Sequence, residues 1–158
     1  MTGKKPLVIN LIGGPGCGKS TAASGLFYAL KKLQVNVEWS TEWVKNKVYE
    51  ESFRCMEDKV DVIVTDCCLL NSLVYGERDE DLDRYILKKF KSYNNLNVLL
   101  CRKQEYVNDG RVESKDEALK LDNMYRQVLR DNNIDFIELD NVDACDYIIS
   151  HLLKNNMI

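Results

Sequence analysis

A cluster of glycines, followed at once by a lysine and a serine, lies near the start of the sequence. Residues 13–20 are G-G-P-G-C-G-K-S, which matches G-x-x-x-x-G-K-[ST] with the fixed glycines at Gly13 and Gly18. Glycines allow the backbone to wrap so that several N–H groups point at one anion. In this pattern the lysine reaches the β- and γ-phosphates, and the hydroxyl takes one position on Mg²⁺. The motif therefore predicts a loop that binds the phosphates of a nucleotide.

The segments on either side of this loop support the prediction. Residues 7–12 form a strand-like apolar run, and residues 19–33 have apolar side chains at helical spacing. A helix that begins at the loop adds its partial positive charge to the same site. At Cys17 the backbone acts, so the thiol is expected to have no role. The expected nucleotide-binding residues are Gly13, Gly14, Gly16, Cys17, Gly18, Lys19, Ser20 and Thr21.

An aspartate ends another strand-like run further along the chain. Residues 60–66 are V-D-V-I-V-T-D, a β-branched stretch that finishes at Asp66. In phosphate-loop proteins an aspartate at this place faces the Mg²⁺ that the loop hydroxyl holds. Ser20 and Asp66 are therefore the expected Mg²⁺ ligands. The alternative, that Asp66 only caps the next segment, stays open.

The residues around Asp66 argue against hydrolysis as the main activity. Motor and AAA-type ATPases usually place a glutamate next to this aspartate to activate water, whereas Cys67 and Cys68 follow here. The later strands carry no N-K-x-D motif, which would indicate guanine recognition, so ATP is the expected nucleotide. A chain of 158 residues is also too short for a full AAA helical lid domain.

A carboxylate after the second expected strand suits transfer to a hydroxyl. Residues 39–43 are W-S-T-E-W, and Glu42 would lie beside the phosphates, where it can deprotonate an attacking hydroxyl. The alternative is that Ser40 or Thr41 caps the next helix and Glu42 only favours its positive end. Both stay open. Two roles also stay open for the aromatic residues of this region, stacking on a nucleobase or packing in the core. These residues are Trp39, Trp43 and Tyr49.

Cations follow the fourth expected strand. Residues 101–111 are C-R-K-Q-E-Y-V-N-D-G-R, which places Arg102, Lys103 and Arg111 near the phosphate edge of the sheet. A lid over residues 102–113, with Gly110 as a hinge, would bring positive charge to the transferring phosphoryl group and exclude water. The alternative is a solvated loop.

Strand-like and helix-like segments alternate along the whole chain. The expected strands are 7–12, 35–39, 60–65, 96–101 and 134–139, and the expected helices are 19–33, 42–57, 79–92, 115–132 and 142–154. This order predicts an α/β fold with a five-stranded parallel sheet, helices on both faces and the ligand at the carboxyl ends of the strands. Ser114 and Glu117 form a capping-box pattern. The expected buried stripes of the last two helices are Ala118, Leu121, Tyr125, Val128 and Leu129, and Cys145, Ile148, Ile149, Leu152 and Leu153.

Composition excludes several other classes. The chain is 45% hydrophobic and 30% charged, which is ordinary for one water-soluble domain. No apolar run approaches the roughly 20 residues of a membrane span, and no signal-peptide pattern follows the start, so a cytoplasmic protein without a membrane partner is expected. Six cysteines without a C-x-x-C pair and one histidine disfavour a zinc site. A net charge of −3 gives no general attraction to nucleic acid.

With these residues together, the chain resembles the small P-loop kinases often encoded by tailed bacteriophages, near thymidylate and deoxynucleoside kinases. The similar segments are residues 12–21, 25–32, 37–42, 61–66 and 106–111. The resemblance implies a nucleotide-kinase-like P-loop NTPase three-layer sandwich, with residues 1–158 as one kinase domain. It also implies that ATP and Mg²⁺ serve transfer to a hydroxyl of a nucleoside, nucleotide or modified base. Glu42 corresponds to the acceptor-side carboxylate, and Arg102 and Arg111 to lid arginines. The expected catalytic residues are Lys19, Glu42, Asp66, Arg102 and Arg111.

The chain departs from these kinases in its acceptor segment. Residues 42–59 leave room for one helix where the related kinases often have two, so the acceptor segment at about 40–59 is short. Three consequences stay open: a site wide enough for a DNA base such as 5-hydroxymethyluracil, a pocket completed by the second subunit of a homodimer, or a degenerate enzyme. A rival hypothesis is an ATP-binding switch or interaction protein that transfers no phosphate.

Overall fold

Five parallel strands form the centre of the protein, seen here in a computed structural model that describes residues 5–40, 56, 59–76, 79–103 and 113–158. The spatial order is β2-β3-β1-β4-β5, with every neighbouring pair parallel. The bounds are β1 Leu7–Ile12, β2 Val37–Ser40, β3 Val62–Thr65, β4 Asn94–Cys101 and β5 Ile137–Asp140. The predicted five-stranded parallel sheet is therefore confirmed, with β1, the strand before the glycine loop, at its centre.

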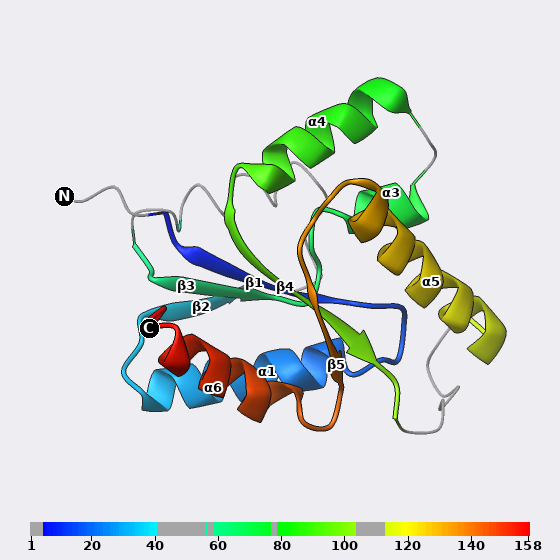
Figure 1. Cartoon of the computed structure of the whole chain (residues 1–158). Coiled ribbons are helices and arrows are strands. Elements are labelled where there is room, and N and C mark those ends of the chain that lie inside the picture. The colour runs from blue at the N-terminus through cyan, green and yellow to red at the C-terminus, as the bar shows by residue number, and fades with distance from the viewer. Residues whose placement is uncertain (1–4, 41–55, 57–58, 77–78, 104–112) are drawn as a thin grey trace.

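Helices cover both faces of this sheet (Figure 1). One face carries α1 (Lys19–Lys32) and α6 (Ala144–Lys154), which contact each other. The other carries α3 (Asn71–Tyr75), α4 (Glu80–Lys91) and α5 (Lys115–Asp131). The result is the predicted α/β three-layer sandwich of a P-loop NTPase.

The apolar run of β1 explains why it occupies the central position. Successive side chains of a strand point to opposite faces. Leu7, Ile9 and Leu11 pack with α1 and α6, whereas Val8 and Ile12 pack with α3, α4 and α5. All five are buried. A strand that is covered on both faces needs this continuous apolar pattern.

Local hydrogen bonds define the starts of two helices. The side chain of Asp79 accepts hydrogen bonds from two backbone N–H groups in the first turn of α4, at Asp81 and Leu82. At the start of α5 the predicted capping box is confirmed, because Ser114 and Glu117 each accept a hydrogen bond from the other's backbone N–H. Hydrogen bonds from the Ser114 N–H and the Ser114 hydroxyl to the Glu117 carboxylate lower the pKa of that group. These caps satisfy N–H groups that have no partner within the helix.

Several elements differ from the sequence-based expectation. The strands β2, β3 and β5 begin two or three residues later than predicted, and β4 begins two residues earlier. The short helix α3 was not predicted, because five residues are too few to show helical periodicity. Apart from Met56, the predicted helix 42–57 lies outside the described residues.

The predicted buried stripes are mostly correct. In α5, Ala118, Tyr125 and Leu129 are buried, and Leu121 and Val128 pack against the core as partly buried residues. In α6, Ile148 and Leu152 are buried, and Cys145 and Ile149 are partly buried. The prediction for Leu153 was wrong. Its side chain is 50% exposed, because the buried stripe passes through Ala144, Ile148 and Leu152 at i, i+4 and i+8. None of the helices in the described ranges is long and apolar enough to cross a membrane.

The neighbouring leucines of α6 provide a test of this packing. Leu152→Ala should lower the free energy of unfolding by about 2–5 kcal/mol, because it leaves a cavity at a fully buried position. Leu153→Ala, at a half-exposed position, should change it by no more than about 0.5 kcal/mol. Urea unfolding followed by circular dichroism measures both values. Equal losses in the two variants would contradict the assigned orientation of the helix.

Candidate nucleotide-binding site

The glycine loop joins the carboxyl end of β1 to the start of α1. Gly13, Gly16 and Gly18 have positive φ angles of 147°, 75° and 90°. Residues other than glycine rarely adopt such φ angles. A turn of this kind directs successive backbone N–H groups into an anion-binding concavity, and the start of α1 adds its positive end. The loop geometry therefore fits the phosphates of a nucleotide.

The interior of the loop is filled by Cys17. Its side chain is fully buried, and a Cβ added at Gly13 would lie 2.6 Å from the Cys17 Sγ atom. Burial raises the pKa of the Cys17 thiol, so it stays protonated at neutral pH. The thiol thus packs inside the loop, and only the backbone of Cys17 is suited to a phosphate.

The side chain of Lys19 reaches back to the first two residues of the loop. Its Nζ atom donates hydrogen bonds to the carbonyl oxygens of Gly13 at 2.8 Å and Gly14 at 2.9 Å. These contacts hold the ammonium group at the loop rather than out in solvent. Ser20 and Thr21, in the first turn of α1, are exposed.

Asp66 reaches the same end of the sheet from the neighbouring strand. The register pairs Asn10 of β1 with Thr65 of β3, and Asp66 follows directly. Its side chain is only 4% exposed, and the indole N–H of Trp39 donates a long hydrogen bond of 3.5 Å to Oδ1. Mg²⁺ is bound through one or two carboxylates together with the phosphates of its substrate. The hydroxyl of the exposed Ser20 and the carboxylate of Asp66 are oxygen ligands of the kind that Mg²⁺ binds.

Trp39 packs into the core beside this carboxylate. Its ring lies 6.4 Å from that of Phe27, at an interplanar angle of 42°, and it is partly buried against the core cluster on the α1 face. Of the two interpretations for Trp39, core packing is therefore the one found. Trp43 and Tyr49 lie outside the described residues, as do Glu42 and Arg111. The catalytic roles of Glu42 and Arg111 stay predictions.

Arg102 directly follows β4, and its side chain contacts α5 and the glycine loop. It forms an ion pair with Asp122 of α5, with Nη2–Oδ2 at 2.7 Å and Nε–Oδ2 at 3.1 Å. The side chains are 9% and 15% exposed. The guanidinium group also donates to the carbonyl oxygens of Pro15 in the loop and Ala118 in α5. Arg102 therefore touches the phosphate loop from outside, and the lid role predicted for it stays a prediction.

Lys103, the next residue, pairs with the last residue of β5 and with an aspartate that follows this strand. Its Nζ atom lies 2.8 Å from an Asp140 carboxylate oxygen and 3.8 Å from one of Asp143. The hydrogen bond to Asp140 raises the pKa of the Lys103 ammonium group. Residues 104–112, most of the expected lid, lie outside the described ranges.

The structure adds site residues that the sequence did not reveal. Asn141 follows β5 and lies against the loop, since a Cβ on Gly18 would be 3.3 Å from its Nδ2 atom. Its position after a strand was a usable signal, because the carboxyl ends of parallel strands meet at one edge. Asp122 gave no such signal, because it lies within a helix. Its Oδ1 atom accepts a hydrogen bond of 2.6 Å from the Gly14 N–H.

A partly buried polar network supports the turn after Asp66. The Tyr125 hydroxyl of α5 donates to Asn71 Oδ1 at 2.8 Å, and Asn71 Nδ2 donates to Cys67 Sγ at 3.4 Å. The Cys68 thiol also donates to Asn71, at 3.5 Å. Burial raises the pKa of Cys68 to about 12. The Cys68 thiol therefore acts as a neutral packing and hydrogen-bonding group.

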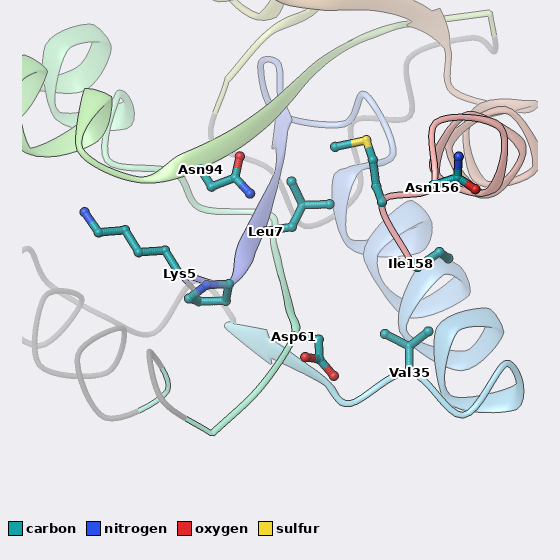
Figure 2. A pocket seen from close by; sticks show the side chains of 9 residues that line it. Lys5, Leu7, Val35, Asp61, Asn94, Asn156 and Ile158 are labelled. Atoms are coloured by element: carbon teal, nitrogen blue, oxygen red, sulfur yellow. The ribbon is translucent and has the colours of Figure 1, made fainter. Parts of the chain in front are cut away.

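A cavity of about 480 Å³ lies elsewhere, at the amino ends of the strands (Figure 2). Leu7 at the start of β1, Asp61 before β3 and Asn94 at the start of β4 line it, together with Asn156 and Ile158 near the carboxyl terminus. None of the loop residues 13–20 takes part. Because ligands of open parallel sheets bind at the carboxyl ends, this cavity is separate from the nucleotide site.

Comparison with known families agrees with this site. A family model described as "AAA domain" matches residues 43–145, more than half of the chain. The chain belongs to this AAA domain family. Together with the glycine loop and the fold, this membership makes it a P-loop NTPase-type domain, a class that binds nucleotides, usually with Mg²⁺. The matched region begins after the glycine loop, and it includes Asp66, Arg102 and Asp122.

Two solved structures show a weaker overall likeness. A de novo designed P-loop protein, determined by NMR in solution, has 16% sequence identity and a TM-score of 0.48, over 96% of this chain and 92% of that chain. The crystal structure of APE1195 has 15% identity and a TM-score of 0.40, over 80% of this chain and 72% of that chain. The comparison with curated proteins found no match.

The buried Cys68 thiol predicts a specific pH dependence of stability. Its pKa is raised from 9.0 to about 12, so the folded protein keeps a proton that the unfolded chain releases above pH 9. The stabilisation is complete below pH 9 and is lost as the pH rises from 9 to about 12. Cys68→Ala should therefore flatten the fall in unfolding free energy over this range. Urea titrations at several pH values measure the slope, and Cys67→Ala is the control. A slope unchanged by Cys68→Ala would contradict the assignment.

Proposed function

We propose that this protein is a Mg²⁺- and ATP-dependent kinase that transfers the γ-phosphate of ATP to a hydroxyl of a nucleoside, a nucleotide or a modified base. One observation carries the proposal. The glycine loop with Lys19 and the buried carboxylate of Asp66 lie together, at the carboxyl ends of the adjacent strands β1 and β3.

Each of these groups has a role that its position supports. Backbone N–H groups of the loop other than that of Gly14, which donates to Asp122, bind the phosphates. Lys19 offsets the charge on the β- and γ-phosphates. Ser20 and Asp66 are the residues that would hold Mg²⁺. When bound, ATP and Mg²⁺ supply the activated phosphoryl group and neutralise the charge that develops on it. The work of the protein is positioning and electrostatic stabilisation.

The residue after Asp66 favours transfer over hydrolysis. Cys67 is partly buried and accepts a hydrogen bond from Asn71. It offers no carboxylate to activate water at that position. The expected base is instead Glu42, which would take the proton of an acceptor hydroxyl during its attack on the γ-phosphorus. The short acceptor segment at 40–59 supports a wide site, with 5-hydroxymethyl-deoxyuridine in DNA among the candidate acceptors.

Membership in the AAA domain family supports a second candidate. Under this hypothesis the protein is an ATP-binding switch or interaction protein, in which the loop responds to ATP without transfer to a small acceptor. The two hypotheses differ in the role of Glu42, because a switch does not need an acceptor-side base.

Incubation with ATP labelled at the γ-phosphate tests the proposal directly. A panel of deoxynucleosides, deoxynucleoside monophosphates and DNA containing 5-hydroxymethyluracil is offered as acceptor. Label should appear in one acceptor class, and Glu42→Gln should reduce that transfer by about 10²–10⁴-fold while ATP still binds. Glu38→Gln is the matched control, since Glu38 is an exposed carboxylate of β2 that pairs with Lys31. Steady release of inorganic phosphate with no labelled acceptor would refute the kinase proposal.

Salt dependence separates a DNA acceptor from a free nucleoside. If the acceptor base lies in DNA, contacts with several phosphates make binding fall steeply as salt increases, because counterions are released on binding. Measured between 50 and 200 mM salt, about tenfold or greater loss of apparent affinity for the acceptor is expected for DNA. A flat response for the labelled acceptor would rule out DNA backbone contacts.

A further inference from the structure

The Arg102–Asp122 ion pair is buried against the outside of the phosphate loop. Removing two charges from water is costly, and a buried pair is often no more stabilising than apolar residues of similar size. Stability alone therefore does not account for this pair, and what its two side chains orient becomes the question. Between them they hold two separate peptide groups of the loop.

The first is the peptide group between Gly13 and Gly14. Its N–H, on Gly14, donates to Asp122 Oδ1 at 2.6 Å. In a trans peptide the C=O and N–H bonds point in opposite directions, and none of the described residues has a cis peptide bond. The C=O of Gly13 therefore points away from Asp122, and there it accepts the hydrogen bond of 2.8 Å from Lys19 Nζ. Asp122 thus sets the direction of a carbonyl group that holds the lysine.

The second is the peptide group between Pro15 and Gly16. Arg102 Nη1 donates to the Pro15 carbonyl oxygen. By the same geometry the N–H of Gly16 points away from Arg102, towards the side of the loop opposite the ion pair. This peptide group is the centre of a turn that the Cys17 N–H closes onto the Gly14 carbonyl oxygen at 3.4 Å, and the contact with Arg102 adds a hold from outside the loop. Because glycine rotates easily, such contacts help both peptide groups to keep one orientation.

Gly14 gives an independent sign that the pair belongs to the loop. The phosphate-loop pattern requires glycine at positions 13 and 18 but leaves position 14 free. A Cβ at Gly14 would lie 2.8 Å from the Ala118 carbonyl oxygen of α5, 2.8 Å from Asp122 Oδ1 and 3.0 Å from Arg102 Nη2. The second glycine of the loop therefore allows the close approach of α5, both of its backbone at Ala118 and of the ion pair that Asp122 forms with Arg102.

We propose that Arg102 and Asp122 are positioning residues that preset the phosphate loop for a nucleoside triphosphate. Asp122 orients the Gly13 carbonyl, and with it Lys19, while Arg102 orients the Gly16 N–H. This role rests on the proposed nucleotide-binding function. It differs from a lid arginine, which would contact the transferring phosphoryl group itself.

Binding of Mg·ATP to three variants, measured by isothermal titration calorimetry, tests the role. Asp122→Asn keeps an acceptor oxygen but removes the charge that holds Arg102, and Arg102→Lys keeps the charge but cannot reach all of its partners at once. Each should weaken binding by about ten- to a hundredfold, the range expected for the loss of a charged hydrogen bond. Glu138→Gln is the matched control. It breaks the ion pair of Glu138 with Arg126, one turn further along α5, and should bind Mg·ATP as the wild type does.

Hydrogen exchange gives a readout that does not depend on the nucleotide. By NMR, the Gly14 amide should exchange slowly in the nucleotide-free wild type and in Glu138→Gln, and faster in Asp122→Ala and Asp122→Asn. Circular dichroism checks that each variant is folded. If Asp122→Ala does not fold, Asp122→Asn supplies the comparison.

The outcomes separate this role from the proposed function. Wild-type protein that binds no Mg·ATP overturns the proposed function, and this role with it. Wild-type binding that is unchanged in Asp122→Asn and Arg102→Lys overturns the positioning role alone. Unchanged affinity with a loss of kcat in Arg102→Lys also overturns it, because Arg102 would then act on the phosphoryl group.

Discussion

The whole site depends on a backbone constraint: a loop of glycines with positive φ angles, held at the carboxyl end of the central strand. Gly13, Gly16 and Gly18 adopt conformations that other residues rarely tolerate. The apolar strand β1 anchors the loop on one side, and the start of α1 anchors it on the other. Because β1 is central, the carboxyl ends of both neighbouring strands, β3 and β4, lie at the same edge of the sheet as this backbone.

The helix α5 connects these loops to one another. Asp122 contacts the glycine loop and the end of β4, and Tyr125, one turn later, contacts Asn71 beside the turn after Asp66. A single helix thus supports both the glycine loop and the turn that follows Asp66, the proposed Mg²⁺ ligand. The capping box of Ser114 and Glu117 fixes where this helix begins. Polar contacts that would be minor in a solvated helix here align the parts of the candidate nucleotide-binding site.

Much of this arrangement could be predicted from the sequence, because the signals are local. The glycine spacing predicted the loop, alternating apolar patterns predicted the sheet and helices, and Asp66 stood at the end of a recognisable strand. The helix α3 and the position of Leu153 were missed or wrong, because five residues show no period and a stripe at 3.6 residues per turn is easily assigned one residue too far. The contacts of Asp122 and Arg102 could not be foreseen, since they join residues that are 108 and 87 positions away from their loop partners.

A crystal structure with Mg²⁺ and a non-hydrolysable ATP analogue tests the central claim most directly. The account predicts that residues 13–20 bind the β-phosphate, with Mg²⁺ between Ser20 and Asp66. It also predicts that the Glu42 carboxylate faces the γ-phosphorus, with room between them for a hydroxyl. Phosphates bound away from the glycine loop would contradict the account. A Glu42 side chain directed away from the γ-phosphate would contradict its transfer chemistry.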